Sequence, residues 1–300
     1  MSADNSSGGK KKASKQAKQA EAPPRPAWLN ETVELFDFDC NVTHLEFEGQ
    51  ADALIESARR LRVTQMLVPG ATIEESKQCL ELARKYPESV FPTAGLHPYN
   101  ATKPFDTDMF SELAALAADS STVAVGECGL DYSDGFPPAE HQLEWFGPQL
   151  ELACSLQKPL FLHERLAHEP FLQALKAHKA TLPPACVHCF TGTADEAKVY
   201  LEMGFYIGIT GFICKPHGAA LQSMLKEGVV PLDRLVVETD APYMGFPNCR
   251  AFESKAAKRQ FPNVPTSLPL VVEVIASCLN MSPVDVALAT THNARRFLRL

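Results

Sequence analysis

The sequence lacks any long apolar segment, which argues against a membrane-spanning or a secreted protein. No run of about 18 uncharged apolar residues, the length needed to cross a bilayer, occurs in the 300 residues. Residues 1–20 are rich in Lys, Ser and Ala and lack the apolar stretch of a secretory signal. We therefore expect an intracellular protein without a membrane partner, cytoplasmic or, if Lys10–Lys12 act as a targeting signal, nuclear.

The nine cysteines are not crowded together, which excludes a small secreted domain held by disulfides. Cys186 and Cys189 form a C-x-x-C pair, but no second pair accompanies it. The segment around them has the pattern of a strand, in which residues three apart point to opposite faces. We therefore expect reduced, mostly buried thiols and disfavour a zinc knuckle or a redox motif.

The chain also lacks an excess of positively charged residues, since its net charge is −8. Residues 1–26 hold five lysines and Arg25 against Asp4 and Glu21, so this segment carries +4 and the remainder −12. An acidic body excludes broad electrostatic wrapping of nucleic acid, but not a local site where metal ions neutralise phosphate. We expect residues 1–30 to form a disordered Lys-rich tail and residues 31–300 to form a single domain.

Eight short apolar or β-branched runs alternate with amphipathic segments along the rest of the chain. This alternation predicts an α/β protein with a parallel sheet, and eight repeats predict a (β/α)₈ TIM barrel. A doubly wound open sheet is the alternative, but no Gly-rich phosphate loop follows the first run. The runs are 33–39, 63–70, 90–98, 122–131, 159–164, 185–190, 205–211 and 234–242, and helical patterns include 51–61, 74–86, 139–157, 193–204, 266–279 and 283–298.

Polar side chains stand at the carboxyl ends of these runs, where barrel enzymes assemble their sites. Strand alternation predicts that Glu127 shares a face with Val123 and Val125. Any one of these residues could be a hydrogen-bonded core or turn residue, but a dry cluster of acids and histidines needs a cation to balance it. Mixed His and carboxylate ligands suit Zn²⁺ or Mn²⁺, and Mg²⁺ if phosphate completes the shell. The six residues are Asp37, His97, Glu127, His163, His188 and Asp240.

Around these residues the sequence resembles the TatD family of metal-dependent deoxyribonucleases, within the amidohydrolase-like barrels. The resemblance runs from about Leu35 to Leu298. Several blocks in the right order are far more specific than any one of them. The blocks are GLHPY (95–99), VGECGLDY (125–132), LHERLAHE (162–169), HCFTGT (188–193), YIGITGFIC (206–214) and ETDAPY (238–243).

The resemblance implies roles for particular residues in a site for one or two divalent ions, with Mg²⁺ preferred and Mn²⁺ or Zn²⁺ as alternatives. Glu127 would lie between two metal positions and take part in catalysis, and His163 and His188 would hold one ion. Asp240 would bind metal or its water and act as general base. His97 and Arg165 would contact substrate phosphate or support the ligands.

The end of the first run departs from the family pattern. Many members have a His-x-His pair there, whereas this chain has Asp37-Phe-Asp-Cys-Asn41. Asp39 and Asn41 can offer only oxygen ligands. We therefore expect the first metal position to be weak, or to fill only with substrate.

The family implies hydrolysis of DNA phosphodiester bonds, as a 3′-5′ exodeoxyribonuclease acting on single-stranded 3′ ends. Aromatic residues near the site could stack on terminal bases or pack the barrel rim. Two alternatives stay open: a metal-dependent hydrolase of a small amide, ester or lactone, and a non-catalytic barrel that binds partners through its Lys-rich tail. The aromatic residues are Tyr99, Tyr132, Phe190, Phe212 and Tyr243.

Overall fold

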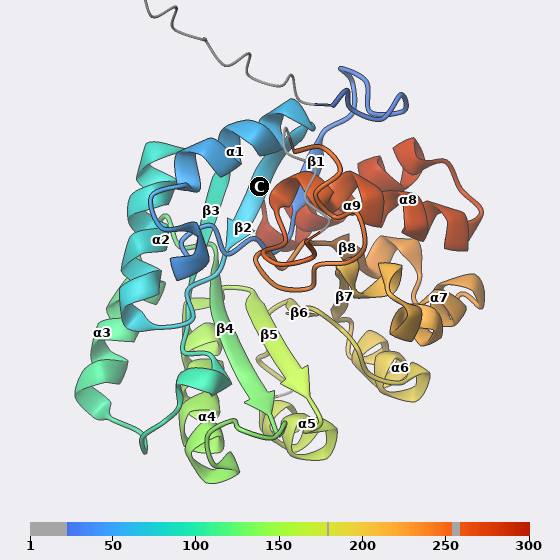
Figure 1. The fold of residues 1–300 in the computed structure, drawn as a ribbon. Helices are drawn as coiled ribbons and strands as arrows, with labels where there is room; N and C mark the ends of the chain where they lie inside the picture. The colour runs from blue at the N-terminus through green and yellow to red at the C-terminus, as the bar shows by residue number, and fades with distance from the viewer. Residues whose placement is uncertain (1–22, 179, 254–258) are drawn as a thin grey trace, which may run out of the picture.

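The computed structural model describes residues 23–178, 180–253 and 259–300, which form a ring of eight strands surrounded by helices (Figure 1). The strands pair in chain order from β1 to β8, and every pairing is parallel. The predicted (β/α)₈ barrel is therefore confirmed. The strands are β1 (Leu35–Asp37), β2 (Val63–Val68), β3 (Val90–Ala94), β4 (Ala124–Asp131), β5 (Leu160–Arg165), β6 (Ala185–Val187), β7 (Tyr206–Ile209) and β8 (Leu235–Val237).

The helices lie outside the strands, and several begin at side chains that cap their first turn. Thr72 and Ser282 accept backbone N–H groups of the helices that follow them, and Thr193 forms a capping box with Glu196. The predicted helical segments agree with the structure to within about two residues, the usual uncertainty of helix ends. The helices are α1 (Ala51–Arg60), α2 (Ile73–Lys85), α3 (Thr107–Ala118), α4 (Ala139–Leu156), α5 (His168–Ala177), α6 (Ala194–Glu202), α7 (Ala219–Lys226), α8 (Leu268–Leu279) and α9 (Pro283–Leu298).

The inside of the barrel is filled by one buried side chain from each strand, and helix α9 covers its amino-terminal end. Phe297 of α9 packs against Phe38, with ring centroids 5.4 Å apart. Thr291 and Asn293 bond to the beginnings of β1 and β8, which fixes α9 across that end. The interior side chains are Phe36, Leu67, Phe91, Ala124, Phe161, Cys186, Tyr206 and Val236.

Backbone pairing between β8 and the end of β1 is short, and Asp37 reinforces it. The backbone is joined by the N–H of Phe38, which donates to Val237 at 3.0 Å, and by a bridge between Cys40 and Ala241. The buried carboxyl group of Asp37 accepts the backbone N–H of Thr239 at 2.7 Å and lies 2.7 Å from its hydroxyl. Asp37 therefore helps to close the barrel.

The expected basic tail falls mostly outside the described residues, which begin at residue 23. Within the part that is described, Leu29 is buried and the indole of Trp28 donates to Glu273 of α8 at 2.7 Å. The expected boundary at residue 30 is therefore too late, because these apolar side chains already pack on the barrel.

No single helix in the described ranges is long and apolar enough to cross a membrane. Two consecutive helical segments, Pro265–Leu279 and Pro283–Leu298, reach that length and composition only together, and they are bent by 108°.

Two substitutions of Asp37 should show how much its hydrogen bonds, as distinct from its charge, contribute to stability. Asp37→Ala removes both acceptors for Thr239, and we expect it to lower the free energy of unfolding by about 1–3 kcal/mol. Asp37→Asn can keep both contacts and should cost much less. Urea denaturation of the two variants measures the difference, and equal losses would contradict the role given to these hydrogen bonds.

The wild type and Asp37→Asn should differ in how their stability depends on pH. Burial raises the pKa of Asp37 to about 8, despite the hydrogen bonds from Thr239. The folded protein therefore holds this proton more tightly than the unfolded chain, so its stability falls as the pH rises from about 4 towards 8. Relative to Asp37→Asn, the wild type should lose up to about 1.4 kcal/mol per pH unit in that window. A stability difference that is independent of pH would contradict this.

Candidate active site

A cavity of about 610 Å³ opens at the carboxyl ends of the strands. Five of the six predicted strand-end residues line it, and the sixth, Asp37, lies outside its lining and closes the barrel instead. Asp39 is wholly buried directly behind the lining, and Asn41 faces the cavity. The five residues are His97, Glu127, His163, His188 and Asp240.

Glu127 reaches the cavity through an irregularity in β4. The register between β4 and β5 shifts between Val125 and Cys128, so strict alternation breaks there. The expectation that Val125 and Glu127 share a face is wrong, because Val125 packs in the outer core between sheet and helices. Gly126 and Gly129 on either side have φ of 137° and 151°, and a side chain on either would collide with the backbone of β5.

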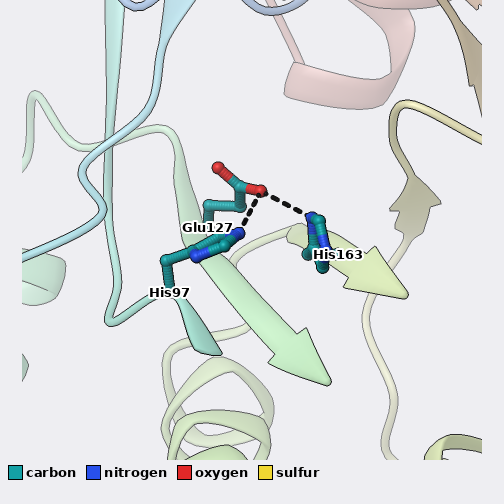
Figure 2. Close-up of side chains that lie close together, drawn as sticks. All are labelled: His97, Glu127 and His163. Atoms are coloured by element: carbon teal, nitrogen blue, oxygen red, sulfur yellow. Dashed lines mark hydrogen bonds and ion pairs between the residues drawn. The ribbon is translucent and has the colours of Figure 1, made fainter. Parts of the chain in front are cut away.

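One oxygen of Glu127 contacts three histidines. Its Oε1 lies 3.1 Å from His97 Nε2, 3.1 Å from His163 Nδ1 and 2.7 Å from His188 Nε2. Figure 2 shows the first two of these contacts converging on that oxygen from β5 and from the loop after β3. The contacts join three segments of chain to the strand that carries Glu127.

The charges of this cluster shift the pKa values of its members. Burial opposes the ionisation of Glu127, but the three imidazoles outweigh it and hold its pKa well below the usual range. Burial likewise opposes the charged forms of His163 and His188, yet nearby carboxylates raise the pKa of both rings. A cation that binds here therefore has to displace protons from these imidazoles.

The hydrogen bonds of His97 fix the position of its proton. Its Nδ1 accepts the backbone N–H of Tyr99 at 3.0 Å, so the neutral ring carries its proton on Nε2. Burial lowers the pKa of His97, which favours that neutral ring. Its Nε2 lies within 4.8 Å of potential metal-binding atoms of Glu127 and His163, but this nitrogen offers a proton and no lone pair. His97 is therefore suited to donate to a carboxylate or phosphate.

His163 and His188 are suited to hold a metal, because each has a carboxylate on its far side. His163 Nε2 lies 2.9 Å from Asp131 Oδ2, and His188 Nδ1 lies 3.0 Å from Asp39 Oδ2. These carboxylates can keep a proton on the outer nitrogen of each ring. The inner nitrogen, which faces Glu127, is then free to bind a cation.

Unpaired buried atoms support a cation in this cluster. Within the described residues, Asp39 Oδ2, His188 Nδ1 and Glu238 Oε2 have no hydrogen-bond partner. The first two are close enough for an ion pair but lack hydrogen-bond geometry. Burial raises the pKa of Asp39 to about 8 against the opposing effect of His188. Imidazole and carboxylate donors with such uncompensated charge fit a divalent ion.

Asp240 stands on a strained turn beside the cluster. Its φ is 51°, and its backbone N–H donates to the backbone carbonyl oxygen of Asp39 at 2.9 Å, which holds the turn. Asn41 Nδ2 lies 3.1 Å from Asp39 Oδ1 and 3.4 Å from Asp240 Oδ1. Burial and then the charge of Asp39 raise the pKa of Asp240 well above its usual range. A carboxylate with a raised pKa can act as a base near neutral pH.

The sequence analysis missed three residues that support the site. The positions of two of them in the sequence could have revealed them. Asp131 ends the fully buried strand β4, and Glu238 begins a polar triplet after the apolar strand β8. The carboxylate of Glu238 accepts the backbone N–H of Cys189 at 2.5 Å, which supports the loop after His188. His44, which bonds to the hydroxyl of Tyr243, had no distinguishing signal.

The aromatic residues near the mouth divide into two groups. Tyr99 and Tyr243 line the cavity and are exposed. Phe190 is buried, and Tyr132 and Phe212 pack against the core, so these three are part of the barrel packing. Phe136, which the sequence did not single out, lines the cavity beside Tyr99 with ring centroids 5.4 Å apart.

Barrel fold and site together define a class of hydrolases that assemble histidines and carboxylates at the ends of parallel strands. The chain belongs to the family of TatD related DNases, whose model matches residues 36–299. The resemblance seen in the sequence is thereby confirmed.

Individual relatives cover nearly all of the barrel. The chain is 40% identical over 267 residues to a protein of Musicola paradisiaca named 3′-5′ ssDNA/RNA exonuclease TatD, with 89% of this chain and 98% of that protein covered. A protein of the same name from Erwinia tasmaniensis is 39% identical, with 89% and 100% covered. The structure of the TatD homologue YjjV of Escherichia coli K12 superposes with a TM-score of 0.78 at 28% identity, covering 89% and 98%.

Asp131→Asn should weaken metal binding, because it removes the charge that keeps a proton on the outer nitrogen of His163. Loss of such a supporting carboxylate lowers metal affinity by about 10- to 100-fold. Titration calorimetry with Mn²⁺ or Zn²⁺ measures this, and binding to the wild type should weaken as the pH falls. Asp195→Asn, on the exposed face of α6, is the matched control and should bind normally. Equal affinity of all three proteins would refute the role of Asp131.

Proposed function

We propose that the protein is a metal-dependent 3′-5′ exonuclease that removes nucleotides from single-stranded DNA and RNA. The observation that carries this proposal is the sharing of one Glu127 oxygen by His163 and His188 inside a cavity at the strand ends. The names of the relatives supply the substrate and extend the DNA expected from the sequence to RNA.

Glu127, His163, His188 and Asp240 would hold a divalent ion, with Mg²⁺ as the physiological metal and Mn²⁺ or Zn²⁺ able to replace it. Asp39 and Asn41 would contribute to a second ion that fills only with substrate. When bound, the metal supplies positive charge that stabilises a phosphoryl group under attack and makes water more acidic. The partly unsatisfied carboxylates of the cluster support this assignment.

The side chains around the metal ligands take the remaining roles. Asp240 accepts a proton from the attacking water, for which its raised pKa suits it. His97 directs the proton on Nε2 at Glu127 and so supports that ligand, and Arg165 supplies a fixed positive charge at the cavity wall. Arg165 is exposed and lines the cavity, so its guanidinium is available to substrate.

The shape and rim of the cavity suit a single strand. A volume of about 610 Å³ is typical of pockets for small ligands and accommodates a terminal nucleotide. Exposed Tyr99 and Tyr243 at the mouth offer ring faces on which unpaired bases can stack. The bases of a duplex are already stacked and paired, and its two backbones would meet the acidic body of the protein.

The alternatives are weaker explanations of the site. Structures of small-molecule hydrolases, such as a 2-pyrone-4,6-dicarboxylic acid hydrolase of Pseudomonas putida with a TM-score of 0.53 at 14% identity, share only the fold. A scaffold without catalysis leaves the buried Glu127 and its three imidazoles without a purpose. The nuclease proposal accounts for both the charge cluster and the similarity to named exonucleases.

Asp240→Asn should abolish most of the activity while leaving the fold intact. Removal of a general base lowers the rate by about 10²- to 10⁴-fold. The test uses 5′-labelled single-stranded DNA and RNA, with Mg²⁺, Mn²⁺ or Zn²⁺ or with chelator, and follows stepwise shortening on gels. Asp195→Asn should cleave at the wild-type rate. No metal-dependent shortening by the wild type, or undiminished shortening by Asp240→Asn, would overturn the proposal.

Arg165→Ala should raise KM for DNA more than it lowers kcat, because a phosphate contact outside the reacting atoms contributes mainly to binding. The effect should shrink at high salt, where the contact is screened. Arg165→Lys keeps the charge but not the paired N–H donors, and its KM for DNA should lie between those of the wild type and Arg165→Ala. Steady-state kinetics with a short oligonucleotide measure both constants, and an unchanged KM in both variants would count against this contact.

A further inference from the structure

Tyr243 and His44 form a hydrogen-bonded pair at the mouth of the cavity. The hydroxyl of Tyr243 lies 2.9 Å from His44 Nε2, and the two rings meet edge to face with centroids 5.3 Å apart. Both residues line the cavity together with Asp240, which precedes Tyr243 by three residues in the same loop. The roles described so far do not explain why this hydroxyl is held so specifically.

The direction of the hydrogen bond follows from the second nitrogen of His44. His44 precedes the short 3₁₀ helix Leu45–Phe47, and its Nδ1 accepts the backbone N–H of Glu46 at 3.1 Å. A neutral imidazole whose Nδ1 accepts carries its proton on Nε2. Nε2 therefore donates to the oxygen of Tyr243, and the phenol keeps its own proton for another acceptor.

That proton is present and has no acceptor among the described protein atoms. Burial and then the carboxylates of Asp240 and Glu127 raise the pKa of Tyr243 to about 12, so the phenol is protonated at neutral pH. In the described ranges, His44 is the sole hydrogen-bond partner of the hydroxyl. The side chain is 47% exposed, which leaves room for a substrate oxygen beside it.

We propose that Tyr243, oriented by His44, is the general acid that protonates the 3′-oxygen leaving from the upstream nucleotide. This inference rests on the proposed exonuclease function. A water oxygen forms the new bond to phosphorus, Asp240 takes a proton from that water, the P–O3′ bond breaks, and the proton of Tyr243 passes to the departing oxygen. The Nε2–H of His44 stays bonded to the phenolate until solvent carries the proton from Asp240 back to it.

The other proton donors that line the cavity are less suited to this step. The proton of His97 is directed at Glu127, and the guanidinium of Arg165 does not release its protons in proteins. A sugar alkoxide is a stronger base than a phenolate, so transfer from Tyr243 to the leaving oxygen is favourable. The bond from His44 lowers the cost of the phenolate that forms.

The test compares two substrates that differ in their need for an acid. Single-stranded DNA leaves through a sugar oxygen that needs a proton, whereas the p-nitrophenyl ester of thymidine 5′-monophosphate releases an anion that does not. Tyr243→Phe should lower kcat on DNA by on the order of 100-fold, a typical contribution of a general acid. It should keep most of the wild-type kcat on the ester. His44→Ala should show the same pattern with a smaller loss on DNA.

Matched variants separate catalysis from structure. Tyr86→Phe removes a hydroxyl that bonds to Asp52 at 2.8 Å outside the lining of the cavity, and it should behave as the wild type on both substrates. Activity of Tyr243→Phe on the ester shows that its site is folded. Equal losses on both substrates, or no loss on either, would overturn the assignment of Tyr243. A wild type inactive on both substrates with every metal would instead overturn the exonuclease proposal, and this inference with it.

Discussion

The site depends on one carboxylate oxygen that imidazoles from three separate segments of chain contact. Oε1 of Glu127 receives imidazoles that follow β3, lie on β5 and follow β6. A charge held in this way needs donors around it, and the barrel supplies them because its parallel strands all end at one rim. The carboxylates on the far sides of His163 and His188 orient these rings, so the position of each imidazole is held by contacts on both of its nitrogens.

The sequence was sufficient for the architecture, because alternation of apolar runs and amphipathic segments is a direct consequence of a parallel sheet covered by helices. It was also sufficient to find His163 and His188, which keep regular alternation with Phe161 and Cys186 inside the barrel. The alternation of strand residues did not predict the orientation of Glu127. The register of β4 shifts between Val125 and Cys128, so this side chain points into the cavity although regular alternation from Val125 would not place it there.

Other features depend on contacts between distant segments and have no local pattern. Asp37 stands among the strand-end acids in sequence, yet its partner Thr239 lies 202 positions later and engages it in closing the barrel. The pairing of His44 with Tyr243 likewise spans 199 positions. Residue type and strand position identify candidates for chemistry, whereas the proton that each nitrogen carries becomes visible only when all its neighbours are placed.

Helix α9 seals the end of the barrel opposite the cavity, where Phe297 and its neighbours fill the space beneath Phe38 and Phe161. Within the described residues the cavity is thus a blind recess rather than a tunnel. In the proposed exonuclease, a strand cannot pass through this recess, so a released nucleotide has to leave by the opening through which the next one enters.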